Sequence, residues 1–274
     1  MSERTRWIEL EGAVNVRDLG ELPTTDGGTT RLGRILRADN LQDLTVTDTR
    51  VLLDHYRLKN VIDLRSDPEV RLEGPGPLTR TPSVTLHHLS LFSEGGRHTD
   101  VAADTPTDGN GTGDIDLDRV LPWQQRPDHG PHHERPIGHY LGYLRDRADS
   151  IVAALRVMAR TDGAALVHCA AGKDRTGVVC ALALTVAGVT REAVVADYAQ
   201  TGERLPQILD RLRASSTYAA DLDSRPADSH TPHAAIMDKF LTRIDEEHGG
   251  VTAWLTAHGW TGEDTDALRS RLID

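Results

Sequence analysis

The feature that most constrains this chain is the run His168-Cys169-Ala170-Ala171-Gly172-Lys173-Asp174-Arg175-Thr176-Gly177. A short apolar stretch at 164–167 leads into it, and a long apolar helical pattern at 178–186 leads out. This order is typical of a strand, a tight loop and a helix that begins at the loop. Backbone N–H groups at a helix start point at one spot, and the helix dipole makes that spot favour anions. The run therefore predicts an oxyanion-binding loop whose field favours the thiolate form of the cysteine.

The residue types in this loop suit chemistry on a phosphomonoester. Cys169 is the expected nucleophile, and a cysteinyl-phosphate would split one hard step into two easier ones. Arg175 is expected to bind phosphate bidentately and to stabilise the transition state. Thr176 offers a hydroxyl to the sulfur as it leaves, and His168 orients the loop by hydrogen bonding. The expected phosphate-binding positions are Ala170, Ala171, Gly172, Lys173, Asp174 and Arg175, with Gly172 permitting positive φ and Lys173 adding charge at the rim.

The proton donor for the leaving oxygen is left open between carboxylates. Asp174 lies inside the loop, whereas Glu94 follows a predicted strand at 82–89 and Asp100 comes a little later. A solvated loop carboxylate is the plainer interpretation of Glu94. Cys180 lies within the apolar helix and is interpreted as a core residue.

The run resembles the active-site signature of the cysteine-dependent protein tyrosine phosphatase superfamily, and most of all its actinobacterial and fungal branch. Three further segments are similar to that branch: Asn15-Val16-Arg17-Asp18-Leu19-Gly20, Arg34-Ile35-Leu36-Arg37-Ala38-Asp39-Asn40-Leu41 and Val61-Ile62-Asp63-Leu64-Arg65-Ser66. Ala38 stands where the branch usually has serine, and Val194-Val195-Ala196-Asp197-Tyr198 also looks familial. The resemblance runs from about residue 12 to 200.

The resemblance implies a phosphatase-like central sheet flanked by helices, with a helical lid at about 120–145 or 203–220. A plain surface pair of helices is the alternative to the lid. It also implies activity on phosphotyrosine, with phosphoserine, phosphothreonine or phosphoinositides accepted by some members. The lysine inside the loop, here Lys173, is shared with several phosphoinositide phosphatases. The expected partners are therefore a phosphorylated protein, a lipid head group or a small phosphate ester.

Two other functions stay open at this point. One is a phosphoinositide or small-molecule phosphatase, acting on a sugar or nucleotide phosphate in a metabolic pathway. The other is a phosphate-binding module that has lost catalysis. Turnover of an aryl phosphate separates the module from the enzymes, and a substrate comparison separates the enzymes from one another.

Charge and cysteine content exclude several classes of function. The net charge of −11 argues against nucleic acid as a partner, because such binding depends on basic patches. The two cysteines make no disulfide framework, and no Cys/His spacing predicts a metal site; no cofactor is expected. No apolar stretch suits a signal peptide or a transmembrane helix. We expect a cytoplasmic protein, with signal-less secretion as the alternative.

The positive charge of the site must therefore be local. Beyond Lys173 and Arg175, three arginines are candidates. Arg17 is expected to form an ion pair with Asp18 at the pocket edge, Arg65 to pair with a carboxylate, and Arg37 to do either.

Helix and strand patterns alternate, which favours an α/β layer fold. The patterns predict helices at 47–57 (with Thr47 or Asp48 as N-cap), 136–160, 176–187, 190–199 and 204–213, and strands at 60–64, 82–89 and 164–168. Gly188 is the expected C′ glycine. We expect a single domain over 1–274, with a flexible insertion at about 93–135 and a helical C-terminal part at about 233–274, where Trp254 and Trp260 pack in the core.

Overall fold

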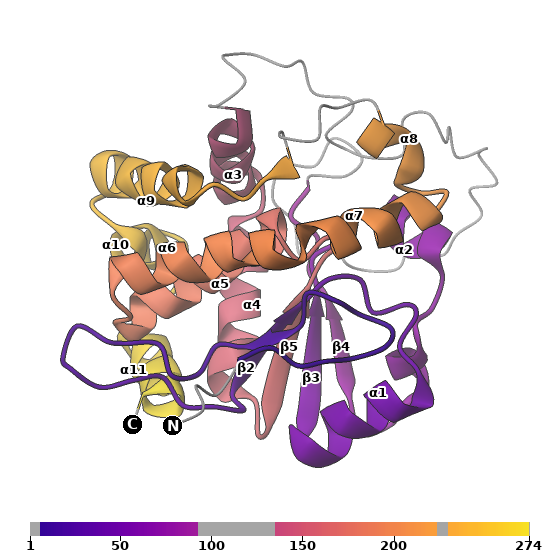
Figure 1. Cartoon of the computed structure of the whole chain (residues 1–274). Helices are drawn as coiled ribbons and strands as arrows, with labels where there is room; N and C mark the ends of the chain where they lie inside the picture. Colours follow the sequence, from indigo (N-terminus) through magenta and orange to yellow (C-terminus); the bar gives the residue numbers. More distant parts are fainter. Residues whose placement is uncertain (1–5, 93–134, 224–229, 274) are drawn as a thin grey trace, which may run out of the picture.

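A five-stranded sheet forms the centre of the computed structural model, which describes residues 6–92, 135–223 and 230–273 (Figure 1). The strands, in sheet order, are β1 (Arg17–Asp18), β2 (Ile35–Ala38), β5 (Ala164–His168), β3 (Leu58–Asp63) and β4 (Thr85–His88). β1 is antiparallel to β2, and all other neighbours are parallel. The predicted α/β class is confirmed. Because parallel strands end at one edge, their carboxyl ends gather the loops that follow them.

Helices cover both faces of the sheet. In chain order they are α1 (Val46–Arg50), η1 (Val51–His55), α2 (Asp67–Glu73), η2 (Pro77–Arg80), α3 (Arg135–Asp146), α4 (Ala148–Arg160), α5 (Asp174–Ala187), α6 (Arg191–Gln200), η6 (Thr201–Arg204), α7 (Leu205–Ala214), α8 (Ala219–Asp223), α9 (Ala234–His248), α10 (Val251–Ala257) and α11 (Gly262–Leu272). Among the described residues, no helix is both long enough and apolar enough to cross a membrane.

Strand β5 separates two hydrophobic cores by the alternation of its side chains. Ala165 and Val167 join the larger core, which includes residues of α3, α4, α5, α9, α10 and α11. Ala164 and Leu166 face the other side and pack with η1 and η2. Successive side chains of a strand point to opposite faces, so this pattern buries β5 completely. The strand is thereby fixed between two cores just before the loop that begins at Cys169.

Several local predictions are confirmed. The strand at 164–168 has the predicted bounds. Gly188 ends α5 in the left-handed conformation, with φ of 93°, and Thr190 caps α6 by accepting from the amide of Ala193. Trp254 and Trp260 are 3% and 2% exposed and belong to the larger core.

Other local predictions are wrong or incomplete. The helix expected at 47–57 begins one residue early, at Val46, because Thr45 rather than Thr47 or Asp48 is its N-cap, and it widens into a π-type turn at η1. Asp48 is instead the N3 residue of the capping box. Strand β2 was not predicted, although it lies inside the sheet, and neither was α8. The insertion predicted at 93–135 lies outside the described residues except for Arg135, where α3 begins.

Helices α7 and α8 lie at the carboxyl ends of the strands (Figure 1). Ile208, Leu209 and Leu212 of α7 form a cluster with Tyr218 and with Ala170 of the loop after β5. Of the two segments expected as a lid, 203–220 therefore packs directly on the loop. The start of the other, at 120–134, lies outside the described residues.

Candidate active site

Three carbonyl groups of the loop at residues 169–175, here called the phosphate loop, are bonded on the β1–β2 side. The backbone N–H of Asn40 donates to the Ala170 carbonyl at 2.9 Å. The side-chain amide of Asn15 donates to the Ala171 carbonyl at 2.9 Å, and the guanidinium of Arg37 to the Gly172 carbonyl at 2.7 Å. Three successive carbonyls are thus satisfied on one side of the loop.

The backbone N–H groups of the same residues have no such partners. Within the described part of the chain, the N–H groups of residues 170–173 donate no hydrogen bond to the protein. Helix α5 begins directly afterwards at Asp174, so its first-turn N–H groups add to the same end. Donors without partners at a helix start form an anion-binding site. These N–H groups are the donors that the predicted oxyanion cup would use, and anion binding by the loop stays a prediction.

Gly172 is required by the path of this loop. Its φ is +66°, a conformation that residues with a side chain rarely adopt. A Cβ atom at this position would lie 2.4 Å from the carbonyl oxygen of Ala38 in β2. The loop therefore passes too close to the sheet for any residue but glycine.

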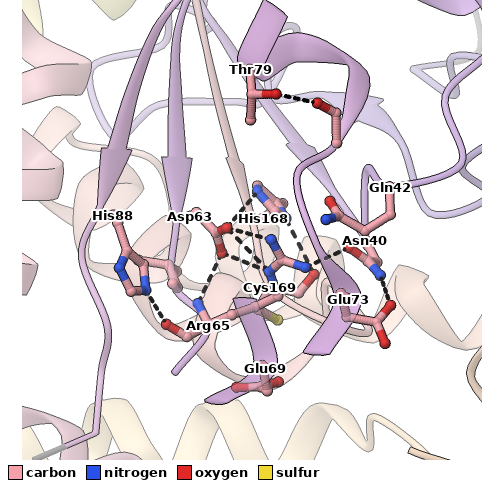
Figure 2. A network of polar contacts seen from close by, with 12 residues as sticks. Asn40, Gln42, Asp63, Arg65, Glu69, Glu73, Thr79, His88, His168 and Cys169 are labelled. Carbon is pink, nitrogen blue, oxygen red and sulfur yellow. Dashed lines mark hydrogen bonds and ion pairs between the residues drawn. The ribbon is translucent and has the colours of Figure 1, made fainter. Parts of the chain in front are cut away.

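Arg175 is held by a buried carboxylate that the sequence did not point to. Glu69 accepts from both terminal nitrogens of Arg175, at 2.6 and 2.9 Å, and is itself fully buried. The amide of Ser66 and the hydroxyl of Tyr218 also donate to Glu69, at 2.8 and 3.2 Å. Burial opposes ionisation, but the charge of Arg175 outweighs it and lowers the pKa of Glu69. Figure 2 shows Glu69 below Cys169.

His168 sits in a second polar network at the ends of β3 and β5 (Figure 2). Its Nε2 lies 3.7 Å from Asp63, and its Nδ1 lies 3.4 Å from the Cys169 carbonyl. Burial lowers the pKa of His168 to about 4, so the ring is neutral at pH 7. Asp63 also accepts from Arg65, with Nη2 at 2.6 Å, which confirms that Arg65 pairs with a carboxylate. His168 thus contacts the first carbonyl of the loop, and its role in orienting the loop stays a prediction.

The ion pair expected between Arg17 and Asp18 is wrong. Arg17 donates instead to Asp197 of α6 at 3.1 Å, and Arg37 donates to the other oxygen of Asp197 at 2.6 Å. Asp18 accepts from the amides of Gly20 and Gly33. Adjacent residues of a strand point to opposite faces, which keeps the side chains of Arg17 and Asp18 apart. Although burial opposes ionisation, the two arginines hold the pKa of Asp197 well below its usual value.

The two cysteines occupy different surroundings, as predicted. Cys169 begins the phosphate loop, whereas Cys180 lies inside α5, where burial raises the pKa of its thiol to about 12. Both are buried, and neither forms a disulfide. Thr176 was expected to donate to the Cys169 sulfur, but its Oγ1 makes no hydrogen bond with any described residue. Its hydroxyl is therefore buried and available as a donor.

Of the candidate proton donors, Asp174 is the one that lies in the described part of the chain, at the start of α5. Its Oδ1 accepts from the hydroxyl of Tyr140 at 2.5 Å, and its Oδ2 lies 3.6 Å from the ammonium of Lys173. Lys173 also donates to the carbonyl of His230 at 2.8 Å. The other candidates, Glu94 and Asp100, lie outside the described residues. Residues 6–92, 135–223 and 230–273 hold no group of three or more His, Cys, Asp or Glu side chains suited to a metal ion.

Comparison with known proteins agrees with this geometry. A family model described as "Tyrosine phosphatase family" matches residues 8–274. The chain belongs to the tyrosine phosphatase family. This family is cysteine-dependent, so the chain is a cysteine-dependent phosphatase, and the family that the sequence resembled is confirmed.

Relatives of this tyrosine phosphatase come from different bacteria. A protein of Mycobacterium tuberculosis named "Triple specificity protein phosphatase PtpB" is 27% identical over 97% of this chain and 98% of its own length. A "Tyrosine-protein phosphatase" of Nostoc commune is 33% identical over 43% of this chain and 42% of its own. A "Putative tyrosine-protein phosphatase" of Cupriavidus necator is 27% identical over 90% and 82%. The narrower actinobacterial and fungal branch stays a prediction.

Sequence reasoning missed the residues that hold this tyrosine phosphatase loop in place. Glu69 is 106 positions from Arg175, and Asp197 is 160 positions from Arg37. One local signal was available for Glu69: Ser66 and Glu69 form a capping box at the start of α2, and their spacing is the signature of that motif. The signal predicts a helix, but not that its acidic residue reaches an arginine.

Proposed function

We propose that Cys169 is the nucleophile of this phosphatase and that Arg175 binds the transferred phosphoryl group. In the first step the thiolate attacks phosphorus, the bond to the leaving oxygen breaks, and that oxygen takes a proton from a carboxylic acid. In the second step water attacks phosphorus, the P–S bond breaks, and its electron pair returns to sulfur. Covalent catalysis of this kind divides one difficult displacement into two.

The observation that carries the proposal is the polarity of the phosphate loop. Its carbonyls at Ala170, Ala171 and Gly172 are bonded on the β1–β2 side, and the N–H groups of residues 170–173 have no partner in the described chain. The guanidinium of Arg175 is fixed by two bonds to Glu69. Preorganised donors of this kind stabilise developing charge because they need no rearrangement during the reaction.

Asp174 and Glu94 remain the two candidate donors to the leaving oxygen. Asp174 has support from its position in the loop beside Arg175. Replacing each in turn with its amide, and measuring turnover of aryl phosphates with leaving groups of rising pKa, separates them. The true donor loses more activity as the leaving group becomes poorer, because a poor leaving group depends more on protonation.

We also propose that Thr176 assists the second step by donating to the departing sulfur. Support comes from its buried hydroxyl, which makes no hydrogen bond with any described residue, the Cys169 sulfur included, and so is available as a donor. A buried donor without an acceptor costs about 1–3 kcal/mol, so a thiolate acceptor is favourable.

Phosphotyrosyl proteins are the proposed substrates, with phosphoserine, phosphothreonine and phosphoinositides as further ones. The printed name of the mycobacterial relative, a triple specificity phosphatase, supports a broad range. A phosphatase of small metabolic phosphate esters is the rival proposal. Comparing turnover of phosphotyrosyl peptides, inositol phosphates, and sugar or nucleotide phosphates decides between them, and no preference for the peptide would overturn the first.

The nucleophile is tested with an aryl phosphate. The wild type should turn it over, Cys169→Ser should lose activity by at least about 10³-fold, and iodoacetamide should inactivate the wild type unless phosphate protects it. Retained turnover in Cys169→Ser would refute the assignment. A wild type without turnover that still binds phosphate would favour a phosphate-binding module.

Location and domain organisation are proposals as well. A thiolate nucleophile suits a reducing compartment, and neither cysteine forms a disulfide in the structure, so we propose the cytoplasm. We propose one domain over 1–274, which the continuous core from Leu19 to Leu272 supports.

A further inference from the structure

A chain of three polar groups reaches from α6 through α3 to the phosphate loop. The hydroxyls of Tyr140 and Tyr198 lie 2.8 Å apart, and the Tyr140 hydroxyl lies 2.5 Å from Oδ1 of Asp174. An ionised carboxylate only accepts hydrogen bonds, so Tyr140 donates to Asp174. The Tyr140 hydroxyl has one proton, and therefore Tyr198 donates to Tyr140. The order of donation along this chain is fixed.

The ring of Tyr140 has little freedom to move. The residue is 1% exposed, and its ring stacks on Tyr143 with centroids 6.1 Å apart. It also meets the rings of Phe240 and Tyr198 edge to face, at 5.6 and 6.4 Å. Close-packed aromatic rings keep their rotamers, so the position of the Tyr140 hydroxyl is set by the core.

Asp174, in contrast, is only partly covered. Its side chain is 37% exposed, and it stands at the first position of α5, next to Arg175. A carboxylate on a half-open loop residue would have several rotamers if nothing held it. The bond from Tyr140 to Oδ1 selects one of them, while the side chain stays partly exposed.

The charges around Asp174 favour its ionised form. Burial opposes ionisation, but Lys173 and Arg175 on the loop, the Tyr140 hydroxyl and the neighbouring His139 of α3 outweigh it, and the pKa of Asp174 is lowered. The helix N-terminus acts in the same direction. Tyr140 stays a neutral donor, because burial and Asp174 raise its pKa well above the usual value.

Resting on the proposed cysteinyl-phosphate mechanism, we propose that Tyr140 is a positioning residue that holds the Asp174 carboxylate as the base of the second step. Asp174 takes a proton from the attacking water as the new O–P bond forms. The P–S bond breaks and its electron pair stays on Cys169 as thiolate. Asp174 then returns its proton to solvent, or to the next leaving oxygen. The assignment does not depend on whether Asp174 or Glu94 serves the first step.

The test measures decay of the phosphoenzyme by rapid quench in single turnover, using 4-nitrophenyl phosphate, whose good leaving group makes little demand on an acid. In Tyr140→Phe the decay should slow about tenfold, and in Asp174→Asn about 10²-fold, since a positioned base contributes in that range. The value of kcat/KM, which reports phosphoenzyme formation, should fall less than the decay rate does in both variants. The double variant should decay no more slowly than Asp174→Asn, because the two groups act as a unit.

Tyr56→Phe is the matched control. It also removes one tyrosine hydroxyl, from a half-buried residue packed against the other core. Its decay rate should equal that of the wild type. Circular dichroism and binding of vanadate confirm that each variant is folded, and Asp174→Asn, at a half-exposed position, provides the result if Tyr140→Phe fails to fold.

Unchanged decay in Tyr140→Phe or in Asp174→Asn would overturn the inference, and so would a loss confined to kcat/KM. Failure of the proposed function has a different signature. In that case the wild type forms no phosphoenzyme at Cys169, and no variant can be compared with it.

Discussion

The phosphate loop is held from two sides that differ in what they fix. On the β1–β2 side, Asp197 neutralises Arg17 and Arg37, and Arg37 fixes a loop carbonyl; all three side chains are at most 1% exposed. On the α2 side, Glu69 fixes the guanidinium of Arg175, which a phosphate would also contact.

The two sides therefore have different roles: one holds the loop backbone, and the other holds a side chain that would contact phosphate. The Asp197 side shapes the backbone and is sealed from any ligand, so its charge balance is constant. The Glu69 side gains a second set of negative oxygens each time a phosphate binds to Arg175. We therefore expect ligand to influence one side and not the other, and each prediction below tests this contrast.

The largest effect is expected from Asp197→Asn. It leaves the buried Arg17 and Arg37 without a carboxylate, and breaking a buried charge cluster typically costs about 3–5 kcal/mol. Chemical denaturation should show that loss. Saturating phosphate should stabilise this variant no more than the wild type. Extra stabilisation by phosphate would show that the Asp197 side also responds to ligand.

Lowering the pH should next weaken the network in which His168 contacts Asp63 and the Cys169 carbonyl. The pKa of His168 falls from 6.5 to about 4 on burial in the folded state, so the unfolded chain takes up the proton first. The stability contributed by the neutral ring is complete above pH 6.5 and is lost as the pH falls toward 4, in all about 3 kcal/mol. The pKa of Asp197 lies well below this window, so its side stays ionised.

The histidine contribution is isolated by subtracting the pH profile of His168→Gln from that of the wild type. The subtraction cancels the contribution of the buried carboxylates of Asp18 and Asp39. Burial raises their pKa values, so these two groups make the protein more stable as the pH falls, opposite to His168. A difference that stays constant between pH 7 and 4.5 would contradict the prediction.

Glu69→Gln should cost about 2 kcal/mol, because Arg175 loses its charged partner but keeps hydrogen-bonding oxygens nearby. Here phosphate should restore part of the loss, since it brings negative oxygens to the same guanidinium and binds only the folded state. The melting temperature should therefore rise more with phosphate in Glu69→Gln than in the wild type. An equal rise in both would remove the contrast between the two sides.

The smallest effect is expected from Tyr218→Phe. It removes one hydrogen bond to Glu69, at 3.2 Å, from the segment between α7 and α8. The unfolding free energy should fall by about 1 kcal/mol, and kcat/KM by a few-fold at most. A loss as large as that of Glu69→Gln would show that Tyr218, rather than the ion pair, determines the position of Arg175.

The sequence was sufficient for the loop and its flanking elements because their signals are local. The strand at 164–168, the helix after it and the caps at Gly188 and Thr190 follow from neighbouring residues. Strand β2 was missed because Arg37 interrupts an otherwise apolar run, and only its buried partner Asp197 makes that charge tolerable inside a sheet.

The residues that hold the phosphate loop in place could not be found from the sequence, for a related reason. Asn15 and Asn40 bind loop carbonyls through contacts that depend on how the sheet is ordered. Tyr140 and Tyr143 are two aromatic residues at helical spacing in α3, and core packing explains both equally well. Which of them meets Asp174 depends on how α3 packs against α5.

The position of Asp197 also bears on the order in which this enzyme matures during synthesis. Arg6, Arg17 and Arg37 leave the ribosome 191, 180 and 160 residues before the carboxylate that neutralises them. Until α6 emerges, these guanidiniums stay hydrated and Arg37 has no counter-charge for entering the sheet. A nascent chain released before residue 197 would carry the complete catalytic motif and yet lack a formed catalytic centre, so enzymatic competence arrives late in translation.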